Sequence, residues 1–383
     1  MSASLLACSS EPPQRRPDEP LPQEFAARGY SSVEQAAVSH TSHPWVVAGQ
    51  TITVNLDMPE RGDRLPLVIY VPGLGEASDA GDAWRSAWAG AGYAVMSVQP
   101  LLEDATAWSS DLARDGDFVK LGKQRHAPAV MADRLRRLDQ VLGEARRRTS
   151  AGEAPWQRVA WDRVAIAGFG LGAYTAMAVA GERISSADQP LTTVSVRAAI
   201  ALSPYVSFSQ GSLDTRYKGI RLPTLSVTSD ADRDVLGQAD GPLLRAAAFS
   251  HLQGNDKYLL SLRSLPHAAF SGSAHAAGPQ PEREAGLPAR PFSWLAPADP
   301  SAQRRGGRQG PVGDGGQLAI MERERWVGIQ PLTATGLELG RIAIQHVSTA
   351  FLDAYLKDDA LAREWLVMNA QRWMGRSGEL RHR

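Results

Sequence analysis

The chain has 383 residues, of which 43% are hydrophobic, so it can bury one large core or two medium ones. Lys+Arg and Asp+Glu both number 41, so the formal net charge is zero. Without a long run of one sign, the sequence argues against a nucleic-acid partner and favours a small molecule. The single cysteine, Cys8, excludes an internal disulfide and a cysteine-rich metal site.

The N-terminal segment admits two interpretations. "LLACSS" around Cys8 is similar to the end of a bacterial lipoprotein signal, but only seven residues precede the cysteine. Either a signal is missing upstream and Cys8 carries a lipid anchor, or this is an ordinary N-terminus of a cytoplasmic protein. The first interpretation predicts a periplasmic or membrane-anchored protein. In both, we expect residues 1–48 to form a tether, because proline and charge dominate residues 9–25. No run of about 18 apolar residues predicts a membrane span.

From residue 49 onward, strand and helix patterns alternate. The segments 51–59 and 66–73 are expected to be strands that form a hairpin. Further strands are predicted at 94–100, 163–168, 196–204, 223–230 and 257–264, and helices at 83–93, 126–148, 173–180 and 349–366. Strands separated by helices predict an α/β fold with a mainly parallel central sheet and helices on both faces.

One stretch interrupts this alternation. Residues 271–317 are rich in Gly, Pro, Ala and Arg, and we expect an insertion within a domain that spans 49–383. Phe292, Trp294 and Leu295 could cover a pocket as a lid, or the segment could be a surface insertion.

The segment "VAIAGFGLGAYTAMAVAG" (164–181) fits two motifs. Gly168-x-Gly170-x-x-Ala173 after a strand fits the dinucleotide fingerprint of an NAD(P)-binding oxidoreductase. That fingerprint needs an acidic residue at the end of the next strand, which here ends in Ser203 and Pro204. The nearby acids, Glu182 and Asp188, precede that strand. We therefore favour the other motif and expect no cofactor.

The second motif is the Gly-x-Ser-x-Gly nucleophile elbow, with Gly168 and Gly172 in place and Gly170 where serine should stand. It requires an oxyanion loop, then an acid, then a histidine. "PGLGE" after the second strand offers the backbone N–H of Leu74 or Gly75, and Leu171 follows the elbow position.

The acid and the base are expected after two later strands. "SDADRD" offers three carboxylates, of which Asp232 is the predicted acid, while Asp230 and Asp234 are expected to face solvent. "SLPHAAF" places His267 just beyond the last strand, where a catalytic base is expected.

These pieces together resemble the dienelactone-hydrolase-like and platelet-activating-factor-acetylhydrolase-like branch of the α/β hydrolases. The matching stretches are "LPLVIYVPGLGE", "DRVAIAGFGLGAYTAMAVAG", "LPTLSVTSDAD", "KYLLSLRSLPHAAFSG" and "STAFLDAYLKDD", within residues 50–270 and 340–367. The resemblance implies the α/β-hydrolase fold and hydrolysis of a carboxylic ester or lactone, without a metal or cofactor.

The sequence departs from this family at the nucleophile. Gly170 cannot attack a carbonyl, and Pro72 replaces the histidine that usually precedes the oxyanion glycine. The chain could be a ligand-binding pseudo-hydrolase, an inactivated variant, or a protein in which His267 and Asp232 activate water. Ser203 is a further candidate, as a displaced nucleophile. Activity is expected to be weak or absent.

Overall fold

The structure, a computed structural model, describes residues 19–184, 193, 195–206, 211–239, 241–273 and 333–383. Two sequence predictions therefore lie wholly or mostly outside the described residues. They are the lipid anchor at Cys8 and the insertion at 271–317, with its three large apolar residues. Within that range only residues 271–273 are described, and Ser271 is buried in the fold.

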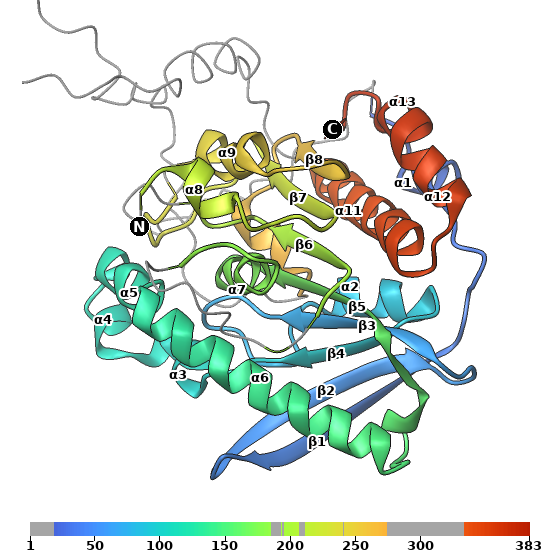
Figure 1. The fold of residues 1–383 in the computed structure, drawn as a ribbon. Coiled ribbons are helices and arrows are strands. Elements are labelled where there is room, and N and C mark those ends of the chain that lie inside the picture. The colour runs from blue at the N-terminus through green and yellow to red at the C-terminus, as the bar shows by residue number, and fades with distance from the viewer. Residues whose placement is uncertain (1–18, 185–192, 194, 207–210, 240, 274–332) are drawn as a thin grey trace, which may run out of the picture. The chain divides into compact units, whose positions relative to one another are not determined.

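A nine-stranded mixed sheet forms the centre of the described part, in the order β1-β2-β4-β3-β5-β6-β7-β8-β9 (Figure 1). The six strands from β4 to β8 in this order run parallel. At one edge β2 pairs antiparallel with β4 and β1 pairs antiparallel with β2, and at the other edge β9 pairs antiparallel with β8. The strands are β1 Val38–Val47, β2 Gln50–Pro59, β3 Leu65–Val71, β4 Ala94–Val98, β5 Val159–Phe169, β6 Ala198–Leu202, β7 Thr224–Ser229, β8 Lys257–Leu262 and β9 Gly378–His382. The prediction of an α/β protein with a mainly parallel sheet is confirmed.

Helices surround this sheet. They are α1 Pro22–Ala27, α2 Asp82–Gly90, α3 Leu102–Ala105, α4 Asp111–Arg114, α5 Phe118–Arg125, α6 Pro128–Ser150, α7 Leu171–Val179, α8 Leu213–Tyr217, α9 Pro242–His251, α11 Ala334–Leu356, α12 Ala360–Glu364 and α13 Ala370–Met374. Proline at the first position of α6 and two arginines in its last turn match the preferences of helix ends. Within the described ranges, no helix combines the length and apolar character that crossing a membrane requires.

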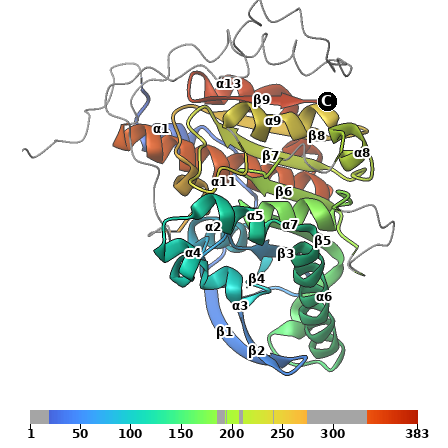
Figure 2. The same cartoon turned by 90° about the vertical axis from the view of Figure 1, so that its left-hand side faces the viewer.

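Alternate residues of the central strands belong to two separate hydrophobic cores, one on each face of the sheet. On one face, Leu67, Ile69 and Val71 of β3 pack with residues of α6 and α7. On the other, Val68 and Tyr70 pack with α2 and α11 (Figure 2). Because side chains alternate along a strand, a strand covered on both faces is apolar throughout, as the sequence of β3 is.

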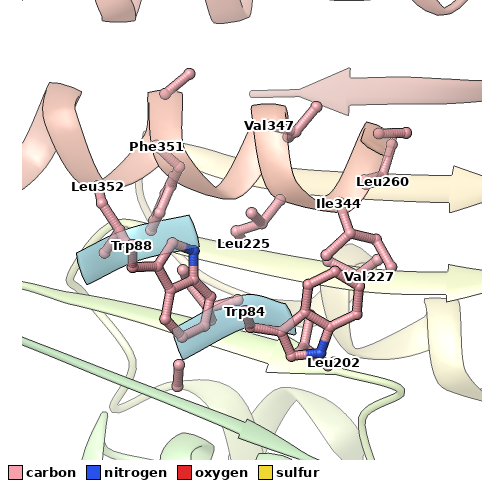
Figure 3. Close-up of a cluster of buried hydrophobic side chains, with 14 of the residues drawn as sticks. Trp84, Trp88, Leu202, Leu225, Val227, Leu260, Ile344, Val347, Phe351 and Leu352 are labelled. Atoms are coloured by element: carbon pink, nitrogen blue, oxygen red, sulfur yellow. The ribbon is translucent and has the colours of Figure 1, made fainter. Parts of the chain in front are cut away.

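The core beneath α11 is the larger of the two. Trp84 and Trp88 of α2 lie fully buried between α11 and the sheet, against side chains of β6, β7 and β8 (Figure 3). The Trp84 indole donates to the Phe270 carbonyl at 2.9 Å, and the Trp88 indole donates to the Ser348 hydroxyl at 2.9 Å. Burial of both rings with satisfied N–H groups fixes α2 on the sheet.

The expected tether over residues 1–48 is wrong for its second half. β1 pairs with β2 along ten residues, and Phe25 of α1 is 2% exposed in the larger core. β1 is an edge strand whose exposed residues are mostly polar, so the apolar alternation that marks a strand in sequence is weak there.

Two further predictions differ from the structure. The expected hairpin of 51–59 with 66–73 does not form, because β2 pairs with β1 and β4 while β3 pairs with β4 and β5. The predicted helix 349–366 is divided, since α11 ends at Leu356 and α12 begins after Asp359, whose carboxylate caps the new helix. Neither outcome can be derived from local periodicity, because strand partners and helix breaks depend on tertiary contacts.

Candidate functional site

The turn between β5 and α7 contains Gly170, which has φ +54° and ψ −108° and directly precedes the helix. This left-handed φ disfavours side chains. The Gly170 N–H donates to the Leu202 carbonyl at 2.9 Å, so the turn is tied to the end of β6. Gly170 thus sits in a sharp connection between strand and helix, in a conformation that would strain a residue with a Cβ.

The two flanking glycines are required by close backbone contacts. A Cβ on Gly168 would lie 2.3 Å from the carbonyl of Gly172, and a Cβ on Gly172 would lie 1.9 Å from the Val71 carbonyl oxygen. The register of β3 with β5 pairs Val71 with Gly168, which brings these segments together. The sharp turn therefore depends on glycine at 168 and 172.

Gly170 is different. A Cβ added there would have, within 4 Å and among the residues that are described, only the ring atoms Cε1 and Nε2 of His267, each at 3.9 Å. A side chain at position 170 would thus have room and would point at the imidazole nitrogen of His267.

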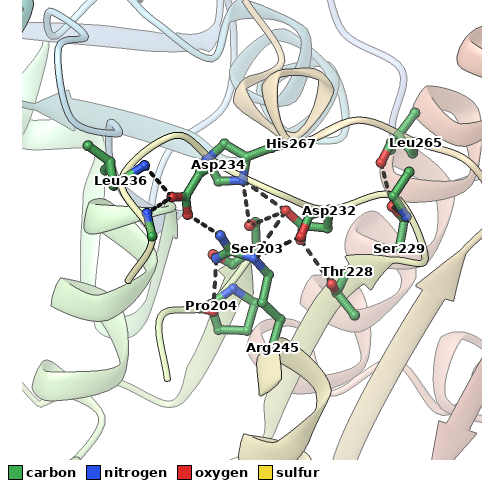
Figure 4. Close-up of polar contacts among 12 residues, drawn as sticks. Ser203, Pro204, Thr228, Ser229, Asp232, Asp234, Leu236, Arg245, Leu265 and His267 are labelled. Carbon is green, nitrogen blue, oxygen red and sulfur yellow. Dashed lines mark hydrogen bonds and ion pairs between the residues drawn. The ribbon is translucent and has the colours of Figure 1, made fainter. Parts of the chain in front are cut away.

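His267 begins a short 3-10 helix, His267–Ser271, that follows β8, and Asp232 lies in the loop after β7. The Nδ1 atom of His267 lies 2.8 Å from Oδ1 of Asp232 (Figure 4). The structure therefore brings together the sequence-predicted base and acid. With Nδ1 donating to the carboxylate, a neutral ring carries its lone pair on Nε2, on the side of Gly170.

Asp232 is fully buried and surrounded by donors. The hydroxyls of Ser203 and Thr228 donate to its two carboxylate oxygens at 2.8 and 2.9 Å, and Arg245 Nε lies 3.2 Å from Oδ1. Burial alone would raise the pKa of the Asp232 carboxyl, but the Arg245 charge, the hydrogen bond and charge of His267, and the Ser203 hydrogen bond outweigh it and lower that pKa. The carboxylate therefore stays charged.

Asp230 and Asp234 are not solvent-facing, contrary to the sequence prediction. Asp230 is 8% exposed and accepts a hydrogen bond from the Ser264 N–H. Asp234 forms an ion pair with Arg245, whose guanidinium also donates to the Ser203 carbonyl. Arg245 comes from α9, and no signal in the local sequence of the acidic loop identifies it as a partner.

Ser203, the displaced-nucleophile candidate, lies on the other side of the imidazole. Its Oγ is 3.0 Å from Nδ1 of His267, and the residue is fully buried at φ +53°. A nucleophile served by His267 would need to face Nε2. The position of Ser203 therefore fits support of Asp232 and not attack on a substrate.

The oxyanion loop follows β3. The Gly75 N–H already donates to the Asp104 carbonyl at 2.7 Å, which takes it away from the candidate oxyanion donors. For Leu74 and Leu171, the described part of the chain offers their N–H groups no acceptor. Leu171 is the first residue of α7, where N–H groups have no partner within the helix. Leu74 and Leu171 thus remain the candidate pair of donors.

A buried carboxylate that sequence reasoning missed holds this loop. Glu76, 4% exposed, accepts from the Gly73 N–H at 2.8 Å and from the Ser271 hydroxyl. Gln99 donates to the carbonyls of Gly73 and Glu76 at 2.9 and 3.0 Å. Burial raises the pKa of Glu76, although its two hydrogen bonds oppose the rise.

The apolar surroundings of the two donors come from the helices inserted after β4. Leu74 and Leu171 share a buried cluster with Leu121 of α5 and Leu135 of α6. Trp108 lies directly over Gly75, where an added Cβ would be 1.9 Å from the indole nitrogen. Trp108 thus lies beside the loop, whereas Trp84 and Trp88 belong to the core beneath α11.

The dinucleotide interpretation gains no support from these residues. β6 ends at Leu202, and the following Ser203 serves Asp232 instead of presenting an acid to a ribose. The buried Glu182 carboxylate forms an ion pair with Arg216, and Asp188 lies outside the described residues. Among the described side chains, no three His, Asp, Glu or Cys groups gather so that they could hold a metal ion.

No family model matches the sequence, and no curated protein matches it either.

Proposed function

We propose that this protein is an α/β hydrolase of carboxylic-ester or lactone hydrolase descent that has lost its nucleophile. The observation that carries the proposal is the position of Gly170. A Cβ added at this position would lie 3.9 Å from Nε2 of His267, and Nδ1 of the same ring is held by the buried Asp232 carboxylate. The chain order of elbow, acid and base is the order expected for this class.

The remaining groups support slow hydrolysis by water. An ester carbonyl near the elbow would receive N–H donation from Leu74 and Leu171. His267 Nε2 would take a proton from a water molecule as the water oxygen attacks the carbonyl carbon. The tetrahedral intermediate would collapse with cleavage of the C–O bond, and the imidazolium would return the proton to the leaving alcohol. Asp232 would stabilise the transient positive charge on the ring.

The direct test is Gly170→Ser, assayed with p-nitrophenyl acetate against the wild type and Gly170→Ala. Because loss of the nucleophile costs on the order of 10⁶-fold in turnover, we expect the serine variant to exceed the wild type by about 100-fold or more. The alanine variant, which shares the backbone strain, should gain nothing. If folded Gly170→Ser is no faster than Gly170→Ala, the assignment of elbow and base is wrong.

A non-catalytic role in binding esters or lactones is the second candidate. It is favoured by the presence of the His267–Asp232 pair and of the Leu74 and Leu171 N–H groups, for which the described residues offer no acceptor, in a site whose nucleophile position holds glycine. Such a protein should be stabilised against heat by an ester or lactone without turning it over. Product formation by the wild type that disappears in His267→Ala would instead support water activation.

A further inference from the structure

A hollow of about 960 Å³ lies apart from the elbow, and none of Gly170, Asp232 and His267 lines it. Its walls come from α1, the segment after β8, the first turns of α11, the π-helix Trp365–Asn369, α13 and the turn into β9. Figure 1 shows α1, α12 and α13 close together beside α11. Its volume is that of sites that bind small organic molecules.

The lining is strongly cationic. Arg28, Arg263, Arg372 and Arg376 are among the lining residues, and among those that are described only Glu19 is acidic. The carboxylate of Glu19 accepts from the Thr333 hydroxyl at 3.0 Å. In the described part of the lining, four arginines thus accompany one acidic residue, in a protein whose overall formal charge is zero.

One wall of the hollow is aromatic and apolar. Trp373 stacks on Phe25 at a centroid distance of 4.3 Å, and Trp365 lies 5.4 Å from Trp373. The Trp373 indole donates to the Phe25 carbonyl at 2.8 Å, which fixes the ring in this wall. Trp365 begins the π-helix, an irregularity that is frequent at functional sites.

Arginine binds carboxylates and phosphates through paired N–H donors, and tryptophan faces bind flat or aliphatic groups. From this combination we propose that the hollow binds an organic anion, in which a carboxylate or phosphate is attached to an apolar, preferably aromatic, body. The site is independent of the ester chemistry proposed above, because it shares no residue with the elbow.

The test uses the full chain and calorimetric titration with 1-naphthyl phosphate, 1-naphthoate and the neutral 1-naphthol. The variant Arg263→Gln/Arg372→Gln removes two charges from exposed side chains and is compared with Arg61→Gln/Arg136→Gln, which removes two exposed charges elsewhere. We expect at least one anion to bind saturably, with at least tenfold weaker binding in the first variant and less than twofold change in the second. Whichever of 1-naphthyl phosphate and 1-naphthoate binds more tightly identifies the charged group, phosphate or carboxylate, that the site prefers.

Three further variants separate this site from the elbow. Trp365→Ala should weaken the binding of the naphthyl anion and leave the binding of inorganic phosphate unchanged, since only the contact with the ring is lost. Gly170→Ser and His267→Ala should leave binding intact whether or not they alter esterase activity. The proposal is overturned if neither anion binds, if 1-naphthol binds as tightly, if both double variants weaken binding equally, or if His267→Ala abolishes it. Circular dichroism melting of each variant verifies that it is folded.

Discussion

The hydroxyl of Ser203 lies 3.0 Å from Nδ1 of His267, the nitrogen that faces Asp232, and not on the side that faces Gly170. Ser203→Ala should therefore keep the activity gained by Gly170→Ser within about tenfold, since it removes only one of several hydrogen bonds that support the charged Asp232 carboxylate. His267→Ala in the same background should remove the gain. The measurement is p-nitrophenyl acetate hydrolysis by each double variant. Complete loss with Ser203→Ala would reassign Ser203 as the nucleophile.

Arg245 connects the acidic loop to the end of β6. The residue is 2% exposed and pairs with both Asp232 and Asp234. Arg245→Ala leaves buried carboxylates without their cation, so the free energy of unfolding should fall by about 3–5 kcal/mol. Urea unfolding measures this change. Arg114→Ala, which breaks an exposed pair with Asp111, is the control and should cost less than about 1 kcal/mol.

Gly172 has no room for a side chain. An alanine Cβ would lie 1.9 Å from the Val71 carbonyl oxygen, so β3 and α7 would have to separate. We expect Gly172→Ala to lower the free energy of unfolding by about 3 kcal/mol or more. Gly143→Ala at an exposed position of α6, where an added Cβ meets no described atom within 4 Å, should stabilise the protein by about 0.5–1 kcal/mol. Equal stability of the two variants would contradict the close contact at the elbow.

Gly170 has room but an unfavourable φ. Gly170→Ser and Gly170→Ala should each lower the free energy of unfolding by about 1–3 kcal/mol, because a residue with a Cβ is strained at φ +54°. Urea unfolding of both variants measures the change. A much larger loss for serine than for alanine would mean that the hydroxyl does not fit beside His267.

The lowered pKa of Asp232 predicts a dependence of stability on pH. The folded state holds the carboxylate ionised below the ordinary value of 3.8, mainly through Arg245 against the cost of burial. The resulting stability is fully present above pH 3.8 and is lost as the pH falls through the lower folded value. The difference in unfolding free energy between the wild type and Asp232→Asn should thus shrink as the pH falls below about pH 4. A difference that grows on acidification would contradict the assignment.

The parts of this protein that sequence could predict are those with local signals. The buried strands are continuous apolar runs, and Asp232 and His267 each follow such a strand, so parallel strand ends bring them to one edge of the sheet. Arg245 and Glu76 could not be identified, because their partners lie on other segments of the chain. The edge strand β1 was missed for a similar reason, since its pairing with β2 and not its own pattern makes it a strand.

The three elbow glycines have different roles, two in the fold and one at the position of the nucleophile. Gly168 and Gly172 maintain the turn, while the residue at 170 meets only a histidine ring among its described neighbours. A reagent that is not part of the protein could therefore use the same space. A small external nucleophile such as hydroxylamine or azide, directed at a bound ester, would supply what the chain lacks without changing a single residue.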